Sequence, residues 1–410
     1  MKVIVLSGGF DQIALIEKLK SRGHEVILVD YLDNPPAKSK ADSHCKISTL
    51  NEADVLECAM QNNVSLVTTA CTDQAVLTAA RVSEKLELPF YISASIARNV
   101  TDKVFMKKKF LENNIPSAKY VSIDDSTCIS DINTGDLKYP LVVKPCDCNS
   151  SKGVTKIFSE KDLECAVKNA LLLSRSKKAI IESFIDGREI SIDVWNDNEG
   201  VKILCISGTE KIKSNRNEFT IYQSSYPVQV SKDLKLKIQS AAERIADGFG
   251  LHNCPMLIQA IIKDEELYIL EFSARMGGGS KYKLIEYTSS IDIIECYINR
   301  ILGDTTQIIS PKQSDKFVEL DYVYAYNGTF NKLVNFDKLK NSGIIKEVFQ
   351  YKMCGDVIEK RETSSDRIAG FLLEEDSYEN LIKSRQEILR EVDVVDSDGK
   401  SMMYKKCFLH

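Results

Sequence analysis

Short apolar runs alternate with amphipathic stretches along the first hundred residues. Three apolar runs predict buried strands at 2–6, 25–30 and 65–69. Between and after them, apolar residues spaced three and four apart predict helices at 12–22, 52–61 and 73–86. This alternation is typical of a parallel sheet with helices on both of its faces. Residues 1–100 are therefore expected to form a Rossmann-like α/β unit.

The pattern changes after a break at 93–101. Thr101 is expected to cap a helix that runs to about Asn113, because Pro116 prevents its continuation. The next elements are a strand at 141–144, a polar turn at 147–153, a returning strand at 155–158, a helix at 160–174 and a strand at 179–183. Residues 101–186 are thus predicted to form a small α+β unit.

Longer strands dominate residues 187–310. The expected elements are strands at 189–195 and 201–207, a long polar loop at 208–226, a helix at 235–249 and a hairpin with strands at 257–262 and 267–272. Residues 311–410 mix short strands with one clear helix at 377–389, which predicts a C-terminal α+β unit. Division into several units is expected for 410 residues, because a single hydrophobic core rarely grows so large.

Composition narrows the functional classes. The formal net charge of −5 gives no sign of the basic surface that a nucleic-acid partner would need. The opening apolar run, Val3 to Leu6, is too short for a signal peptide or a membrane span. The 12 cysteines form no CxxC pair and the four histidines lie apart from any cysteine cluster, which argues against a zinc site. We therefore expect a cytoplasmic protein with reduced thiols and no membrane partner.

The hairpin near residue 265 sets polar side chains opposite one another. With a loop at 264–266, Gln259 lies directly across from Glu271, and Ser273 shares their face of the sheet. A buried carboxylate needs a cation beside it. Either Arg275 supplies that cation as a structural ion pair, or the three oxygen-bearing side chains bind Mg²⁺. We favour the metal site.

Two lysines and one loop fit an anionic ligand, although each alone also fits a solvated lysine or an ordinary hairpin turn. Lys144 ends an apolar strand, and Lys103 lies in the first turn of a helix, where the helix dipole disfavours a cation. The small residues of the 149–153 loop let backbone N–H groups approach a phosphate. By contrast, Ser7-Gly8-Gly9 lacks the further glycine of a dinucleotide-binding fingerprint, so a structural turn, or a turn lining a small-substrate pocket, is the better interpretation.

These motifs together resemble those of the ATP-grasp superfamily. The resemblance covers about residues 1–310 and consists of five blocks in the family's order: Thr101-Asp102-Lys103, Val142 to Pro145, Ser150 to Val154, Glu182 to Glu189, and Glu271 to Gly278. Within the superfamily the chain is similar to carbamoyl-phosphate-synthase-like proteins and amino-acid ligases. The resemblance implies a pre-ATP-grasp domain at 1–100, a small or lid subdomain at 101–186 and a large subdomain at 187–310 of a two-part ATP-grasp fold, followed by the unit at 311–410.

The resemblance also implies roles for individual residues. Lys103 and Lys144 would bind ATP phosphates, with Lys144 and Arg275 as the catalytic residues. Glu271, Gln259 and Ser273 would bind Mg²⁺, or Mn²⁺ in its place. The other nucleotide contacts would come from the loop residues Ser150, Ser151, Lys152, Gly153 and Val154, the adenine-binding hinge Glu182, Ser183, Phe184 and Ile185, and the ribose-binding Glu189. The family usually has Asn where this chain has Ser273, and often a carboxylate in place of Gln259, so the expected metal ligands are weaker than usual.

The expected reaction joins a small-molecule carboxylate to an amine through an acyl-phosphate, which makes the protein an ATP-dependent ligase that releases ADP and phosphate. Two alternatives stay open: a carboxylase or carbamoyl-phosphate-synthase-like enzyme that uses bicarbonate, and a non-catalytic nucleotide-binding regulator. The resemblance allows a homodimer. The pocket for the second substrate is expected among residues 8–12, 72–74, 208–226 and 277–281.

Overall fold

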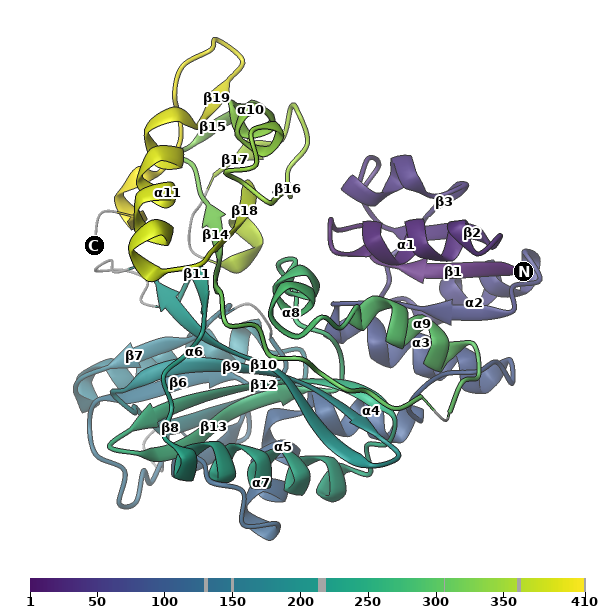
Figure 1. Cartoon of the computed structure of the whole chain (residues 1–410). Helices are drawn as coiled ribbons and strands as arrows, with labels where there is room; N and C mark the ends of the chain where they lie inside the picture. The colour runs from purple at the N-terminus through teal and green to yellow at the C-terminus, as the bar shows by residue number, and fades with distance from the viewer. Residues whose placement is uncertain (129–131, 149–150, 213–218, 306, 360–362, 409–410) are drawn as a thin grey trace.

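The first unit is a four-stranded parallel sheet. The computed structural model describes the chain apart from residues 129–131, 149–150, 213–218, 306, 360–362 and 409–410 (Figure 1). The parallel sheet of the first unit has the strand order β3-β2-β1-β4. Its strands are β1 (Lys2–Leu6), β2 (Glu25–Asp30), β3 (Ser43–Lys46) and β4 (Leu66–Thr68). The helices are α1 (Gln12–Ser21), α2 (Glu52–Gln61) and α3 (Asp73–Lys85). Val3 and Val5 share a core with α1 and Ile4 and Leu6 one with α2, which confirms helices on both faces.

The second sheet is antiparallel and has the order β5-β8-β6-β7. Its strands are β5 (Tyr120–Asp124), β6 (Leu141–Pro145), β7 (Thr155–Ile157) and β8 (Lys178–Ser183), and α6 (Leu163–Leu173) shares their apolar core. The expected α+β unit is therefore present, but its entry differs from the prediction. Thr101 ends a short helix, α4 (Ala94–Thr101), and Asp102 caps α5 (Lys103–Glu112) by accepting bonds from Val104 N and Phe105 N. A carboxylate in that position satisfies the amides that open the helix.

The third sheet has eight strands and includes part of the last hundred residues. Its antiparallel order is β13 (Glu266–Ser273), β12 (Cys254–Lys263), β9 (Arg188–Asp197), β10 (Gly200–Lys211), β11 (Ile221–Tyr226), β14 (Phe317–Val323), β18 (Ala369–Glu375) and β16 (Glu347–Gln350). The loop predicted at 208–226 is too long, because β10 continues to Lys211 and β11 begins at Ile221. Three helices lie between β11 and β14 in the sequence: α7 (Lys232–Phe249), α8 (Lys281–Ser289) and α9 (Ile293–Ile301).

The remaining elements complete the C-terminal section. A small sheet has the order β17-β15-β19, with β15 (Gly328–Val334), β17 (Val357–Ile358) and β19 (Asp393–Asp396), beside the helices α10 (Phe336–Asn341) and α11 (Tyr378–Glu391). Figure 1 shows α8 between this section and the N-terminal unit. Within the described residues, no helix combines the length and the apolar character that crossing a membrane requires.

The hairpin β12–β13 has a shorter turn than expected but the expected pairing. Its turn is Asp264-Glu265, both with positive φ, and Lys263 pairs with Glu266 rather than standing before a three-residue loop. The register then shifts by one residue between Gln259 and Ala260, which is the effect of a β-bulge. This shift compensates for the shorter turn, so that Gln259 does pair with Glu271.

Candidate functional site

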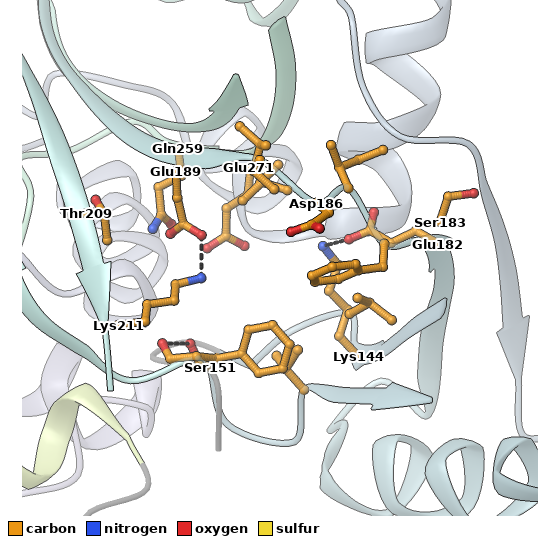
Figure 2. A pocket seen from close by; sticks show the side chains of 18 of the residues that line it. Lys144, Ser151, Glu182, Ser183, Asp186, Glu189, Thr209, Lys211, Gln259 and Glu271 are labelled. Carbon is orange, nitrogen blue, oxygen red and sulfur yellow. Dashed lines mark hydrogen bonds and ion pairs between the residues drawn. The ribbon is translucent and has the colours of Figure 1, made fainter. Parts of the chain in front are cut away.

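A cavity of about 660 Å³ lies between the second and third sheets. Its walls come from α5, β6, β8, β9, β10, β12 and β13. Figure 2 shows the carboxylates of Glu189 and Glu271 and the ammonium groups of Lys144 and Lys211 directed into the same space. This volume lies in the range of small-molecule and cofactor sites. The packing of the second sheet against the third thus brings together charged side chains that are far apart in the sequence.

A buried cluster of three charges forms one end of this cavity. Glu182 of β8 makes ion pairs with Lys144 of β6 and with Lys107 of α5, whose Nζ lies 3.0 Å from its Oε2. Burial by itself would raise the pKa of Glu182, but the two ammonium groups outweigh it and lower that pKa to about 2. Two cations thus face one carboxylate, and the surplus positive charge favours an anionic ligand at Lys144. Lys107 was missed from the sequence, although it lies four residues after Lys103 on one helix face.

Lys103 and Glu271 form a second buried pair. Lys103 Nζ lies 3.0 Å from Glu271 Oε2 and donates to the Cys148 carbonyl at 2.9 Å. Burial opposes both charges, yet the pair overcomes it: the pKa of Lys103 is raised and that of Glu271 is lowered. The ion pair between Glu271 and Arg275 that we considered is therefore wrong, since Lys103 is the neighbouring cation. Gln259 faces Glu271 across the hairpin and lines the same cavity.

Arg275 is paired with a residue from the N-terminal unit. Its Nε donates to Asp73 Oδ1 at 2.8 Å, and its Nη2 bonds to the other carboxylate oxygen. Such a two-pronged pair fixes the orientation of the guanidinium. The pKa of Asp73 is lowered although burial opposes this, because the Arg275 charge outweighs it, and Ser273 also bonds to this carboxylate. The three residues lie on the wall of a second cavity rather than the first.

The loop expected to bind phosphate and the residue expected to bind ribose lie on different sides of the cavity, as Ser151 and Glu189 show in Figure 2. Ser151, Lys152 and Val154 line the first cavity, and Ser151 Oγ donates to the Phe219 carbonyl at 3.3 Å. Gly153 has φ +76, and a Cβ there would lie 2.7 Å from Leu173, so only glycine fits the turn. Ser150 lies outside the described residues. Glu189 of β9 is paired with Lys211 of β10.

The expected hinge lies along one side of the cavity, next to apolar side chains. Ser183, Phe184 and Ile185 line it together with Val142, Ile212, Phe219 and Leu270. The amides of Ser183 and Phe184 already donate to the carbonyls of Lys119 and Pro140. The side chain of Glu182 is occupied by its ion pairs with Lys107 and Lys144 in the buried cluster.

A second cavity of about 500 Å³ adjoins the first and shares Lys103, Ser151, Thr209, Gln259 and Glu271 with it. Its other walls come from every region where a second substrate was expected, with lining residues Gly8 to Asp11, Asp73, Ile221, Ser224, Gly278, Gly279 and Lys281. Gln12, Thr72 and Gln74 are absent from that wall. Tyr322, Tyr351 and Arg367 of the C-terminal section also line this cavity, and no site residue was predicted in that section.

The expected metal ligands lie where the two cavities meet. Gln259 and Glu271 line both cavities, and Ser273 lines the second. Across the described part of the chain, no three His, Cys, Asp or Glu side chains come together as a metal cluster. One carboxylate with an amide and a hydroxyl suits a hard cation that keeps other oxygen ligands, such as phosphate oxygens.

Comparison with known proteins agrees with this arrangement. Residues 137–283 match the family described as the ATP-grasp domain, so the chain contains an ATP-grasp domain. A D-alanine–D-alanine ligase of Macrococcus caseolyticus is 29% identical over 217 residues, which are 49% of this chain and 59% of the ligase. The chain spans just over half the length of the D-alanine–D-alanine ligases that it matches.

Two further similarities extend over more of the chain. A formate-dependent phosphoribosylglycinamide formyltransferase of Prochlorococcus marinus is 26% identical over 311 residues, covering 74% of this chain and 76% of that protein. The crystal structure of an L-amino acid ligase from Bacillus licheniformis superposes with a TM-score of 0.78 at 20% identity, covering 97% of this chain and 98% of the other. The mixed α/β fold of the whole chain is thus shared with that ligase, from the first sheet to the C-terminal section.

Proposed function

We propose that this protein is an ATP-dependent ligase that joins a carboxylate to an amine through an acyl-phosphate and releases ADP and phosphate. The observation that supports this most is the junction of the two cavities. There Lys103, Glu271 and Gln259 line both spaces, with Lys144 on one side and Arg275 on the other. A nucleotide in the first cavity would therefore present its terminal phosphate to a substrate in the second.

We assign the first cavity to ATP. The apolar slot beside Phe184 and Ile185 suits adenine, and Glu189 suits the ribose hydroxyls. Lys144, supported by Lys107 and Glu182, supplies positive charge to the phosphates, as do Lys103 and the amides of residues 151–153; the Val154 amide already donates to the Ser151 carbonyl. Glu271, Gln259 and Ser273 would hold Mg²⁺, and their oxygen set fits this ion. When bound, it would offset the negative charge of the phosphates.

We assign the second cavity to the carboxylate and the amine. Arg275, fixed by Asp73, would stabilise the charge that develops as the phosphoryl group moves to the carboxylate. The acyl-phosphate is a better acyl donor than the acid, and the amine then displaces phosphate from it. Enclosure between two sheets and the 151–154 segment would keep water from the intermediate. We further propose small-molecule substrates, the domain limits given above, a cytoplasmic location and a homodimer.

Release of ADP, followed for acids and amines alone and in pairs, tests this function. The wild type should release ADP only when a carboxylate is present, and Lys144→Met should raise the KM for ATP and slow release. Lys178→Met, a partly exposed lysine in the same sheet, is the matched control and should behave as the wild type. Release driven by bicarbonate alone would favour the carboxylase, and nucleotide binding without any release would favour the regulator.

A further inference from the structure

Arg367 is a buried cation in the second cavity. It follows a short turn in the C-terminal section and is only 8% exposed. Its guanidinium carbon lies 3.5 Å above the centre of the Tyr322 ring, and it also bonds to the Tyr324 hydroxyl. Stacking on a tyrosine offsets part of the cost of burying the charge. The side chain is therefore held in one place at the cavity wall.

This guanidinium has no acidic partner in the part of the chain that the structure describes. Two partly buried arginines do have one: Arg275 pairs with Asp73, and Arg385 lies 3.5 Å from Glu319. The Nε of Arg367 is buried and makes no hydrogen bond within the described residues. A buried, unpaired charge is costly, and a bound anion would remove that cost.

Gly279 lies against Arg367, and its lack of a side chain leaves room for the guanidinium. Gly279 has φ +71, and a Cβ at this position would lie 2.2 Å from Arg367 Nη1 and 3.0 Å from the Tyr322 hydroxyl oxygen. The Gly279 amide donates to Asp11 at 2.8 Å and its carbonyl accepts from Tyr322 at 2.9 Å. The 277–281 turn thus links Arg367 to Asp11 of the N-terminal unit, and the guanidinium forms part of the wall of the second cavity.

The position of Arg367 indicates which substrate group it meets. Lys103 and Glu271 line both cavities, whereas Arg367 lines only the second. A carboxylate bound at Arg367 is therefore separated from the nucleotide cavity and would not be the one that is activated. An amino acid that reacts through its amine carries a carboxylate of this kind, which takes no part in the reaction. Arginine binds carboxylates through two parallel hydrogen bonds, which also fixes the direction of the attached amine.

We propose that Arg367 binds the α-carboxylate of an amino acid whose amine is the acceptor, so that the product is a peptide-like amide. This inference rests on the proposed ligase function and deepens it. Free amino acids and their C-terminal amides test it, because an amide keeps the amine, lacks the carboxylate and cannot itself be activated. ADP release is measured with pairs of standard amino acids, and the accepted amine is then replaced by its amide.

The expected result is a wild-type kcat/KM at least ~30-fold lower for the amide than for the acid. Arg367→Met should lower kcat/KM for the acid by a similar factor, mainly through KM, and should leave the value for the amide nearly unchanged. Arg367→Lys should recover part of the loss, Gly279→Ala should resemble Arg367→Met, and the exposed Arg390→Met is the control. Equal use of acid and amide by the wild type overturns the proposal without any variant. A parallel loss on both compounds in a folded Arg367→Met would mean that Arg367 is only structural.

Two further experiments complete the test. The first asks whether Arg367 binds a carboxylate or a phosphate, and the second distinguishes failure of the Arg367 proposal from failure of the ligase function. Phosphoethanolamine presents a phosphate instead of a carboxylate, and its preference over every amino acid would overturn the carboxylate assignment. Isothermal titration calorimetry of the same amino acids without ATP measures binding alone. Binding that is lost in Arg367→Met, without any ADP release, would support the anion site while contradicting the ligase. ADP release from other substrates, with no amino acid bound, would support the ligase while contradicting the anion site.

Discussion

Replacing Glu182 by Gln tests whether the buried three-charge cluster holds Lys144 in place. The side chains of Glu182 and Lys107 are 4% and 2% exposed, so the substitution leaves two ammonium groups with a neutral amide. The fall in the Glu182 pKa from 4.5 to about 2 corresponds to roughly 3 kcal/mol of stabilisation at neutral pH. Because the folded pKa is the lower one, this contribution is complete above pH 4.5 and is lost as the pH falls towards 2. We therefore expect Glu182→Gln to destabilise the protein by ~3–5 kcal/mol.

Urea unfolding at pH 7, followed by circular dichroism and by the fluorescence of the single tryptophan, Trp195, measures this loss. Glu164→Gln is the control, because Glu164 pairs with Lys168 on an exposed helix face in the same unit and should cost less than ~0.5 kcal/mol. Adding Lys107→Met to Glu182→Gln removes the uncompensated buried cation and should restore part of the stability. A loss no larger than that of the control, or no gain from the second substitution, would refute the cluster as a stabilising element.

Three further predictions follow from the site and its surroundings. Glu271→Gln should abolish ADP formation and destabilise the protein less than Glu182→Gln does, because the Glu271 side chain is 34% exposed and that of Glu182 only 4%; full turnover in this variant would contradict its assignment to the metal. Hydrogen exchange should slow at residues 151–154 and 182–185 when a non-hydrolysable ATP analogue and Mg²⁺ are added, with α11 as the unaffected reference; equal exchange in both states would mean that the loop does not close on nucleotide. Burial, together with the neighbouring Asp321, raises the pKa of Glu319 although Arg385 offsets part of this, so stability should fall as the pH rises from about 4.5 to about 8. Glu319→Gln, in which Asp321, Gln223 and Arg385 still face the site, should flatten that slope by at least ~1 kcal/mol, and an unchanged slope would exclude Glu319 as its source.

Most strands and helices of the first unit were predictable because their patterns are local, whereas β3 and the short helix α4 were not predicted. The helix at 52–61 and the strand at 2–6 have the predicted limits, since apolar periodicity and capping residues mark both. The 208–226 segment misled the prediction for a physical reason. Thr209 and Ser224 are buried in strands, but they are polar because they line the second cavity. A polar strand beside a polar site looks like a loop when only the sequence is considered.

The candidate site was predictable where a residue belongs to a compact motif, and less so where it depends on distant contacts. The pairing of Gln259 with Glu271 follows from a hairpin, although the turn and the bulge were not foreseen. The partners of Arg275 and Lys103 come from elements brought together only by folding. Arg367 has no local signal of this kind, because its environment is made by β14 and the 277–281 turn.

Transfer of oxygen from the carboxylate substrate to phosphate tests the central claim most directly. In an acyl-phosphate mechanism, a carboxylate oxygen attacks the terminal phosphorus of ATP and leaves with phosphate when the amine takes the acyl group. We predict that turnover of amino acids labelled with ¹⁸O in their carboxylates gives inorganic phosphate that carries one ¹⁸O atom, as measured by mass spectrometry, together with ADP. Unlabelled phosphate, or the appearance of AMP and pyrophosphate, would contradict the account.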